Sequence, residues 1–184
     1  FTLVGETDKT LSGVYTSDFA GLQQTASVHD GRHDVTLSMD AGSQWWQLPF
    51  GGARKTTLLL RAGRTLPLDL RLDGGAMNAD MDFRAIPLKN LDINTGATKL
   101  TLTLGDLLEQ SDITIDAGAS SIDLSLPKSV GVALKIDSGL TGKELTDFRK
   151  IDEEHYESEN YASAAKKMDI NLNLGASSVS TTWR

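Results

Sequence analysis

The chain has 184 residues, enough for one domain with a well-buried core, and it contains no cysteine. A disulfide framework and a thiolate zinc site are therefore excluded. Acidic side chains number 25 against 18 basic ones, and the net charge of −7 argues against a nucleic-acid backbone or an anionic membrane surface as the main ligand.

Residues 1–65 are predicted to be β-rich and to cap one end of the domain. Residues 34–42 alternate apolar and polar, residues 56–60 resemble a strand, and residues 18–24 suit a turn or a short helix. No linker separates this portion from residues 66–184, so we expect one continuous domain. Because no apolar run reaches the roughly 18 to 20 residues that span a bilayer, and the chain begins at Phe1, we expect a leader or anchor to have been removed.

Two local motifs stand out in this portion. His29 and His33 have the i, i+4 spacing of a helical metal site, but Asp30 and Gly31 between them favour a turn, so no metal site is predicted. The adjacent Trp45 and Trp46 point to opposite faces if they lie in a strand. They are candidates either for plugging the end of the core or for contacting a ligand or partner.

From residue 66 onward the chain repeats a unit of about 21 residues, each centred on a glycine. Successive glycines lie 21, 22, 21 and then 36 residues apart, so an insertion is predicted near residues 141–167. The predicted corner glycines are Gly75, Gly96, Gly118, Gly139 and Gly175. Apolar residues alternate with polar ones on both sides of each glycine, which is the period of a strand with one buried face.

Each repeat is therefore expected to be a strand, a glycine corner and a second strand. An Asp or Asn stands two residues before each glycine, where it can hydrogen-bond a turn, and glycine can take the positive φ that a corner uses. A single strand pair cannot bury its apolar face alone, whereas stacked pairs form a continuous apolar column. The sequence predicts an all-β stack in which each repeat covers the one before it.

The insertion carries aromatic and acidic residues. Phe148, Tyr156 and Tyr161 suit a loop folded over an edge of the stack, or a recognition surface. The acidic run around His155 lacks the alternating Asp/Asn pattern and fixed glycine of a calcium loop, so an exposed acidic loop is predicted. Tyr156 and Tyr161 join Trp45 and Trp46 as the candidate binding residues.

The stretches "LPLDLRLDGGAMNADMDF", "LDINTGATKLTLTL", "ITIDAGASSIDLSLPKSVGVALKIDSGL" and "YASAAKKMDINLNLGASSVSTTW" resemble the toast-rack domain of bacterial cell-envelope proteins. The resemblance covers residues 66–184, and residues 1–65 loosely resemble the region that often precedes this domain. It implies a single-stranded right-handed β-helix, no established catalytic residues, and binding or sensing at the envelope, in some members by restraining a sensor kinase.

The remaining motifs do not favour catalysis. The serines of "GASS", at residues 118–121 and 175–178, lack a histidine partner and a nucleophile elbow. Asp80, Asp82 and Asp123 are outward-facing carboxylates that a polysaccharide-active β-helix could use, if they faced one another across a substrate. We predict a non-enzymatic recognition or sensing module without cofactor or metal, anchored at the extracytoplasmic face of the envelope. A self-assembling scaffold and a polysaccharide enzyme are the alternatives.

Overall fold

The computed structural model describes residues 2–6, 11–17, 21–29, 32–40 and 56–184, with side chains from Ala62 onward. All regular elements within these ranges are strands, which confirms the all-β class, and no helix there is long and apolar enough to cross a membrane. The strands are β1 (Thr2–Glu6), β2 (Leu11–Ser17), β3 (Gly21–His29), β4 (Arg32–Asp40), β5 (Thr56–Gly63), β6 (Leu68–Asp82), β7 (Leu88–Thr103), β8 (Gln110–Leu126), β9 (Val130–Leu145), β10 (Phe148–Lys150), β11 (His155–Ser158) and β12 (Lys166–Trp183).

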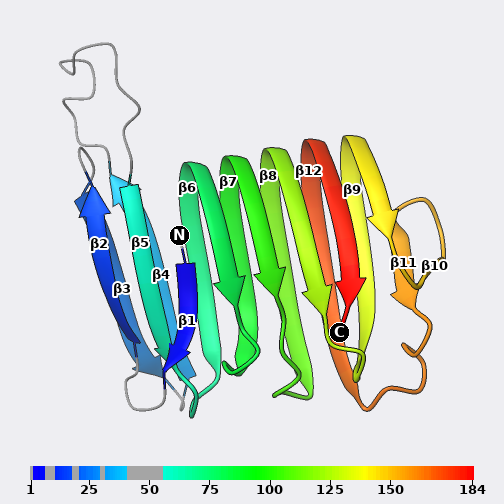
Figure 1. Ribbon diagram of the computed structural model, residues 1–184, viewed down its shortest axis with the longest axis horizontal. Helices are drawn as coiled ribbons and strands as arrows, with labels where there is room; N and C mark the ends of the chain where they lie inside the picture. The colour runs from blue at the N-terminus through cyan, green and yellow to red at the C-terminus, as the bar shows by residue number, and fades with distance from the viewer. Residues whose placement is uncertain (1, 7–10, 18–20, 30–31, 41–55) are drawn as a thin grey trace.

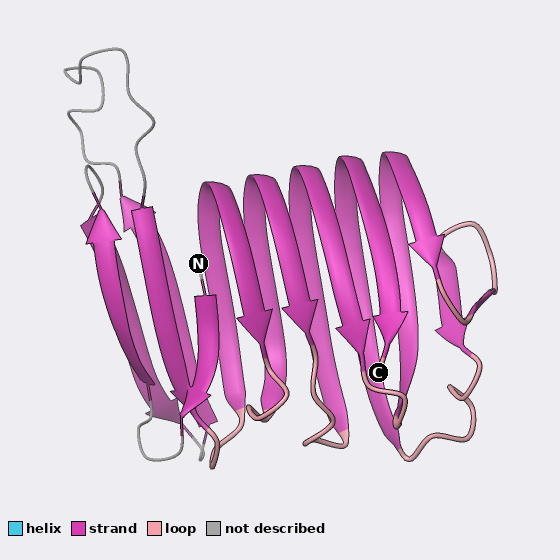
Figure 2. Ribbon diagram, in the orientation of Figure 1, coloured by secondary structure: helices cyan, strands magenta, loops and turns pink. Residues whose placement is uncertain are grey.

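Five long strands, β6 to β9 and β12, form the body of the molecule. Each rises on one side, folds over and descends on the other side, as Figure 1 shows, and each has its predicted corner glycine near its middle. We call the half before the glycine the first arm and the half after it the second arm. Strand pairing is parallel and continues through the corner, so the first arms make one layer of an open, folded sheet and the second arms make the other (Figure 2).

The core lies between the two layers. Alternate residues of both arms point inward, and the long run of leucine and isoleucine at these positions is what the period of two predicts. In the central strands these side chains are almost completely buried: Leu91, Ile93, Leu100, Leu102, Ile113, Ile115, Ile122, Leu124, Ile170 and Leu172. The loop after β6 contributes the buried Phe83 and Ile86, and the loop after β7 contributes the buried Leu104.

The corners contain the predicted glycines, but not for the predicted reason. No corner glycine has a positive φ, and the strand runs through the corner without a turn. Glycine is required because neighbouring corners stack backbone on backbone. A Cβ on Gly96 would lie 2.8 Å from the carbonyl oxygen of Gly75, and one on Gly118 would lie 2.6 Å from that of Gly96. A Cβ on Gly175 would likewise clash with the carbonyl oxygen of Gly118, whereas a Cβ on Gly139 would make an ordinary contact of 3.6 Å with the carbonyl oxygen of Gly175.

The order of the strands in space differs from the predicted order in one place. β6, β7 and β8 are neighbours in sequence order, as expected. β12, however, lies between β8 and β9, and it pairs with both along nearly its whole length. The prediction that each repeat covers the one before it is therefore wrong for the last two strands. β9 does not lie beside β8, and β12, which follows β9 in the chain, occupies the position between them.

The N-terminal strands continue both layers at the other end of the stack. β4 pairs with the first arm of β6 and β1 with its second arm, both in parallel. β3 and β2 then add antiparallel strands outside β4 and β5. Because residues 21–29 form a strand, the short helix considered for residues 18–24 is not formed there. His29 and His33 lie in the antiparallel strands β3 and β4 instead of in one helix.

Candidate recognition surface at the β9 edge

The inserted segment lies against the last strand of the stack. β11 pairs antiparallel with the first arm of β9 at residues 133–135, and β10 pairs antiparallel with β11. Strand β9 itself continues to Leu145, so the segment outside the repeat begins after that residue. In Figure 1 this segment is drawn in yellow to orange at the right-hand end of the molecule.

The predicted binding residues are only partly brought together. Trp45 and Trp46 lie outside the described residues. Tyr156 is half-buried in β11, opposite the buried Leu134, and its ring lies 5.4 Å from the ammonium of Lys143 in the second arm of β9. Tyr161 lies in the turn after β11, where its ring is 4.4 Å from the ammonium of Lys167, and burial raises the pKa of its hydroxyl.

A third aromatic contact closes the lower end of the second arms. The rings of Phe148 and Trp183 have centroids 5.4 Å apart at an interplanar angle of 37°. The Trp183 indole donates a hydrogen bond of 2.7 Å to the carbonyl oxygen of Thr146. The turn into β10 is thereby attached to the end of β12, which supports a packing role for Phe148.

The second arm of β9 forms the edge of its layer. Leu140 is 80 % exposed there, and the two side chains that face inward further along, Lys143 and Leu145, are half-buried. Sequence reasoning missed Lys143. A signal was present, since the same register position holds Ala79, Leu100, Ile122 and Val179 in the other strands, and a lysine departs from that apolar column.

The acidic loop between β10 and β11 is organised by Asp152. Its Oδ1 accepts hydrogen bonds of 2.9 Å from the amides of Glu154 and His155 and lies 2.7 Å from Nδ1 of His155. The amide of Glu154 and the side chain of His155 are the main causes that lower the pKa of Asp152 to about 2. The acidic loop that the sequence predicts is therefore a turn closed by the contacts of Asp152 with Glu154 and His155.

We expect a carboxyl titration of Asp152 with a midpoint near pH 2. The folded pKa lies below the unfolded value of about 3.9, so the stabilisation from this turn is present above that value and is lost as the pH falls through the folded pKa. Carbon-13 NMR of the side-chain carboxyl measures the midpoint directly. A midpoint at or above 3.9 would show that the turn does not form.

Outward-facing polar side chains make ladders across the stack. The Asp and Asn residues two before each glycine were predicted to hydrogen-bond a turn. They lie instead in continuous strands, where they face one another from strand to strand. In spatial order they read Asp73, Asn94, Asp116, Asn173 and Asp137, so that each carboxylate is separated from the next by an amide. Asn173 donates to Asp116 at 2.6 Å. The position of β12 therefore prevents Asp116 and Asp137 from lying side by side.

Replacing Asn173 with aspartate is expected to destabilise the fold by about 1 kcal/mol at neutral pH and low salt, because three carboxylates would then be adjacent. The loss should shrink below about pH 4, where carboxyl groups become protonated. Chemical denaturation at both pH values measures it. Asn171→Asp is the matched control, because its register partners are Thr114 and Lys135. Equal effects of the two substitutions would contradict the strand order.

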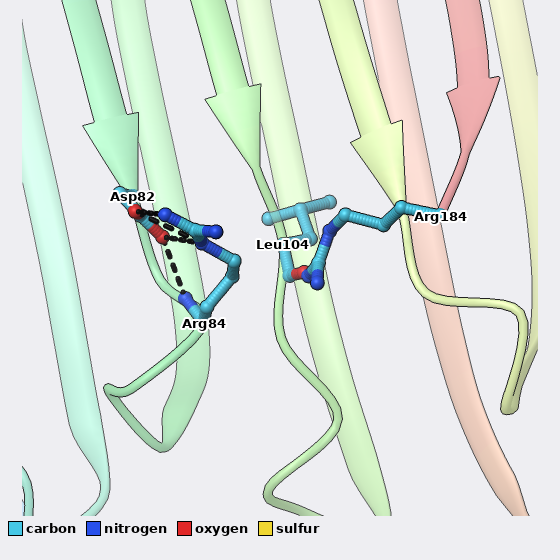
Figure 3. A network of polar contacts seen from close by, with 4 residues as sticks. All are labelled: Asp82, Arg84, Leu104 and Arg184. Carbon is cyan, nitrogen blue, oxygen red and sulfur yellow. Dashed lines mark hydrogen bonds and ion pairs between the residues drawn. The ribbon is translucent and has the colours of Figure 1, made fainter.

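Two of the three carboxylates considered for catalysis, Asp82 and Asp123, bind neighbouring side chains. Asp82 at the end of β6 binds the Arg84 guanidinium, with Nη2 2.6 Å from Oδ2, and also accepts from the Arg84 amide at 3.0 Å (Figure 3). These contacts lower the pKa of Asp82, opposite to the shift that a glycosidic general acid needs. Asp123 accepts from Ser180 at 2.5 Å. Asp80 and Asp123 face the same side with Thr101 between them.

The serines of the two "GASS" stretches also bond to each other across strands. Ser120 and Ser177 are 2.7 Å apart through their hydroxyls, and Ser178 donates to Ser121 at 3.3 Å. The serine hydroxyls therefore join the neighbouring strands β8 and β12 next to their corner glycines. Arg184, directly after β12, reaches past β8: its guanidinium donates to the carbonyl oxygen of Leu104, the residue after β7 (Figure 3).

Known proteins of this architecture settle the family. A family model for the N-terminal domain of toast_rack matches residues 1–125, which is more than half of the chain. The chain belongs to the toast-rack family. The match crosses residue 65 without a break, so the resemblance recognised in the repeats extends into the N-terminal strands.

A solved structure shares the fold of the toast-rack chain. It is described as "a putative cell adhesion protein" from Clostridium sporogenes, with a TM-score of 0.87 and 19% sequence identity, over 100% of this chain and 87% of that one. At this identity the likeness concerns the fold alone. No curated protein matches the sequence.

Proposed function

We propose that this toast-rack chain is a non-enzymatic recognition module of a membrane-anchored bacterial envelope protein, displayed outside the cytoplasm and acting in the response to cell-wall stress. Membership of the family supports the envelope setting, and the description of a protein of like fold as "a putative cell adhesion protein" is consistent with a role outside the cytoplasm. The observation that carries the proposal is the β10–β11 insertion. It interrupts the series of stacked strands and places aromatic and charged side chains beside the β9 edge.

Within this proposal the strands β6 to β9 wind as a right-handed β-helix, with β12 stepping back into the gap. Physical support comes from chain twist, since connections between parallel strands of one sheet are right-handed in about 98% of cases. A crystal structure of the chain tests the winding. A left-handed path from β6 to β7 would overturn it.

The structure disfavours the scaffold alternative. End-to-end assembly that continues the parallel pairing of the stack needs free parallel edges at both ends. In the described residues, antiparallel strands cover the N-terminal end in both layers and the first-arm layer at the other end. Sedimentation of the chain across a wide concentration range is expected to show no open-ended polymer, and filaments that grow with concentration would revive the alternative.

The recognition role is tested by crosslinking the protein in its native envelope and identifying the captured partners by mass spectrometry. We expect a sensor kinase or a wall-assembly protein, and we expect its recovery to fall in the variant Trp46→Ala, Tyr156→Ala. Lys99→Ala, an exposed substitution in the middle of the second-arm layer, is the matched control. Capture of no partner, or equal capture by all three proteins at equal folded abundance, would overturn the proposal.

A further inference from the structure

The two layers of the stack end at different strands beside the insertion. The first-arm layer continues from β9 to β11 and then β10. In residues 62–184, the second arm of β9 pairs with β12 on one side and with no strand on the other. The first-arm layer thus extends two strands farther, and the inner side of β11, with Tyr156, is not covered by a strand of the opposite layer. An extended segment alongside residues 140–145 would continue the second-arm layer over it.

The hydroxyl column inside the corner is incomplete at this edge. Across the strands it reads Met77, Thr98, Ser120, Ser177 and Thr141. Ser120 and Ser177 satisfy each other at 2.7 Å. The hydroxyls of Thr98 and Thr141 are buried but have no hydrogen-bond partner. Thr98 lies between β6 and β8, where a further strand cannot be added, whereas Thr141 lies on the edge strand, where one can. A buried hydroxyl without a partner is costly, and a hydroxyl on a further strand at the same register would supply one, as Ser177 does for Ser120.

Two residues along, the same edge holds a cation without an anion. Lys143 occupies an inward position, and its ammonium faces the ring of Tyr156 at 5.4 Å. The ion pairs within residues 62–184 do not include it. Because residues two apart in a strand face the same way, one added strand would meet both Thr141 and Lys143.

We infer that the second-arm edge of β9 accepts an extended segment of a partner protein, with a serine or threonine beside Thr141, a carboxylate beside Lys143 and an apolar residue beside Leu145. The added strand would gain backbone hydrogen bonds from β9 and cover Tyr156. The exposed Leu140 would lie at its rim. This inference rests on the proposed recognition role and names the surface and the chemistry of the partner.

A second copy of the chain fits this edge poorly. If two β9 edges paired, the inward positions opposite Lys143 would come from Gly139, Thr141, Lys143 and Leu145, which include no carboxylate. The surface therefore favours a partner with an acidic position over self-pairing.

The test uses the whole chain and two labelled peptides with central sequences Thr-Lys-Glu-Lys-Leu and Thr-Lys-Lys-Lys-Leu. Fluorescence anisotropy is expected to show that the wild-type protein binds the glutamate peptide at least about tenfold more tightly, because only that peptide pairs with Lys143. Lys143→Glu should reverse the preference. Lys143→Met, which keeps the packing on Tyr156, should remove it, and thermal unfolding verifies that each variant is folded.

Failure takes distinct forms. Equal binding of both peptides, no binding at millimolar concentration, or a preference that survives Lys143→Met would overturn the inference. So would a wild-type dimer that Lys143→Glu dissociates, since the occupant would then be a second copy. If the peptides fail while crosslinking still captures a partner regardless of Lys143, the recognition role stands and its surface lies elsewhere.

Discussion

Gly118→Ala is expected to lower the free energy of unfolding by about 3 kcal/mol, the upper end of the usual cost of overpacking. The Cβ would lie 2.6 Å from the carbonyl oxygen of Gly96, and that oxygen belongs to a backbone held by parallel pairing. To make room, two corners would have to separate, which would weaken the pairing on either side of them. Urea denaturation of the purified chain measures the loss.

Gly139→Ala is the matched control, since its Cβ would meet the oxygen of Gly175 at 3.6 Å, an ordinary contact. It stands at the same place in the repeat and has no positive φ, so alanine should be neutral or stabilise by up to about 1 kcal/mol through the unfolded chain. If both substitutions cost the same, corner stacking would not be the reason for glycine.

This contrast shows what the sequence could and could not predict about the corners. Glycine at a regular interval located each corner, because only a repeated local need keeps one residue type at a fixed position. It did not distinguish a backbone that needs positive φ from one that needs close approach, since both exclude a side chain. The distinction comes from the distances between neighbouring corners.

The position of β12 between β8 and β9 could not be predicted from the apolar pattern for a related reason. All five long strands carry the same alternation, so any of them can cover any other with a similar apolar surface. The one informative signal was on the outer face, where sequence order would place Asp116 beside Asp137 and the observed order places Asn173 between them. Reading the repeat for charge as well as for hydrophobicity would have favoured the correct order.

The candidate site was only partly predictable. The long interval between the last two corner glycines identified the insertion, and Tyr156 stood out there because it is an aromatic residue outside the repeat. Lys143 stands out once the repeats are aligned on their glycines, because the fourth residue after each of the other corner glycines is apolar. The unsatisfied hydroxyl of Thr141 is recognised only when its surroundings are known. That both residues lie on an edge depends on which strand ends the layer, and that in turn depends on β12. Trp45 and Trp46 lie outside the described residues, so their role stays a prediction.

Leu102→Ala is expected to cost about 3 to 4 kcal/mol, within the range for removing a buried leucine from a core that cannot collapse around the gap. Leu102 has no exposed surface, and β6 and β8 fix it on both sides, with Met81 and Leu124 in register. Parallel pairing on both sides leaves little freedom for the layer to close around a cavity. Thermal and urea unfolding of the variant measure the loss.

Leu145→Ala tests the same column at its open end. The column runs from Met81 through Leu102, Leu124 and Thr181 to Leu145, which is half-buried on the edge strand. Because solvent and the mobility of an edge can fill part of the gap, we expect a loss of about 1 kcal/mol. A loss equal to that of Leu102→Ala would mean that the β9 edge is as tightly enclosed as the centre, and no strand could then be added beside it. The pair of substitutions therefore measures both the rigidity of the stack and the openness of the edge on which recognition depends.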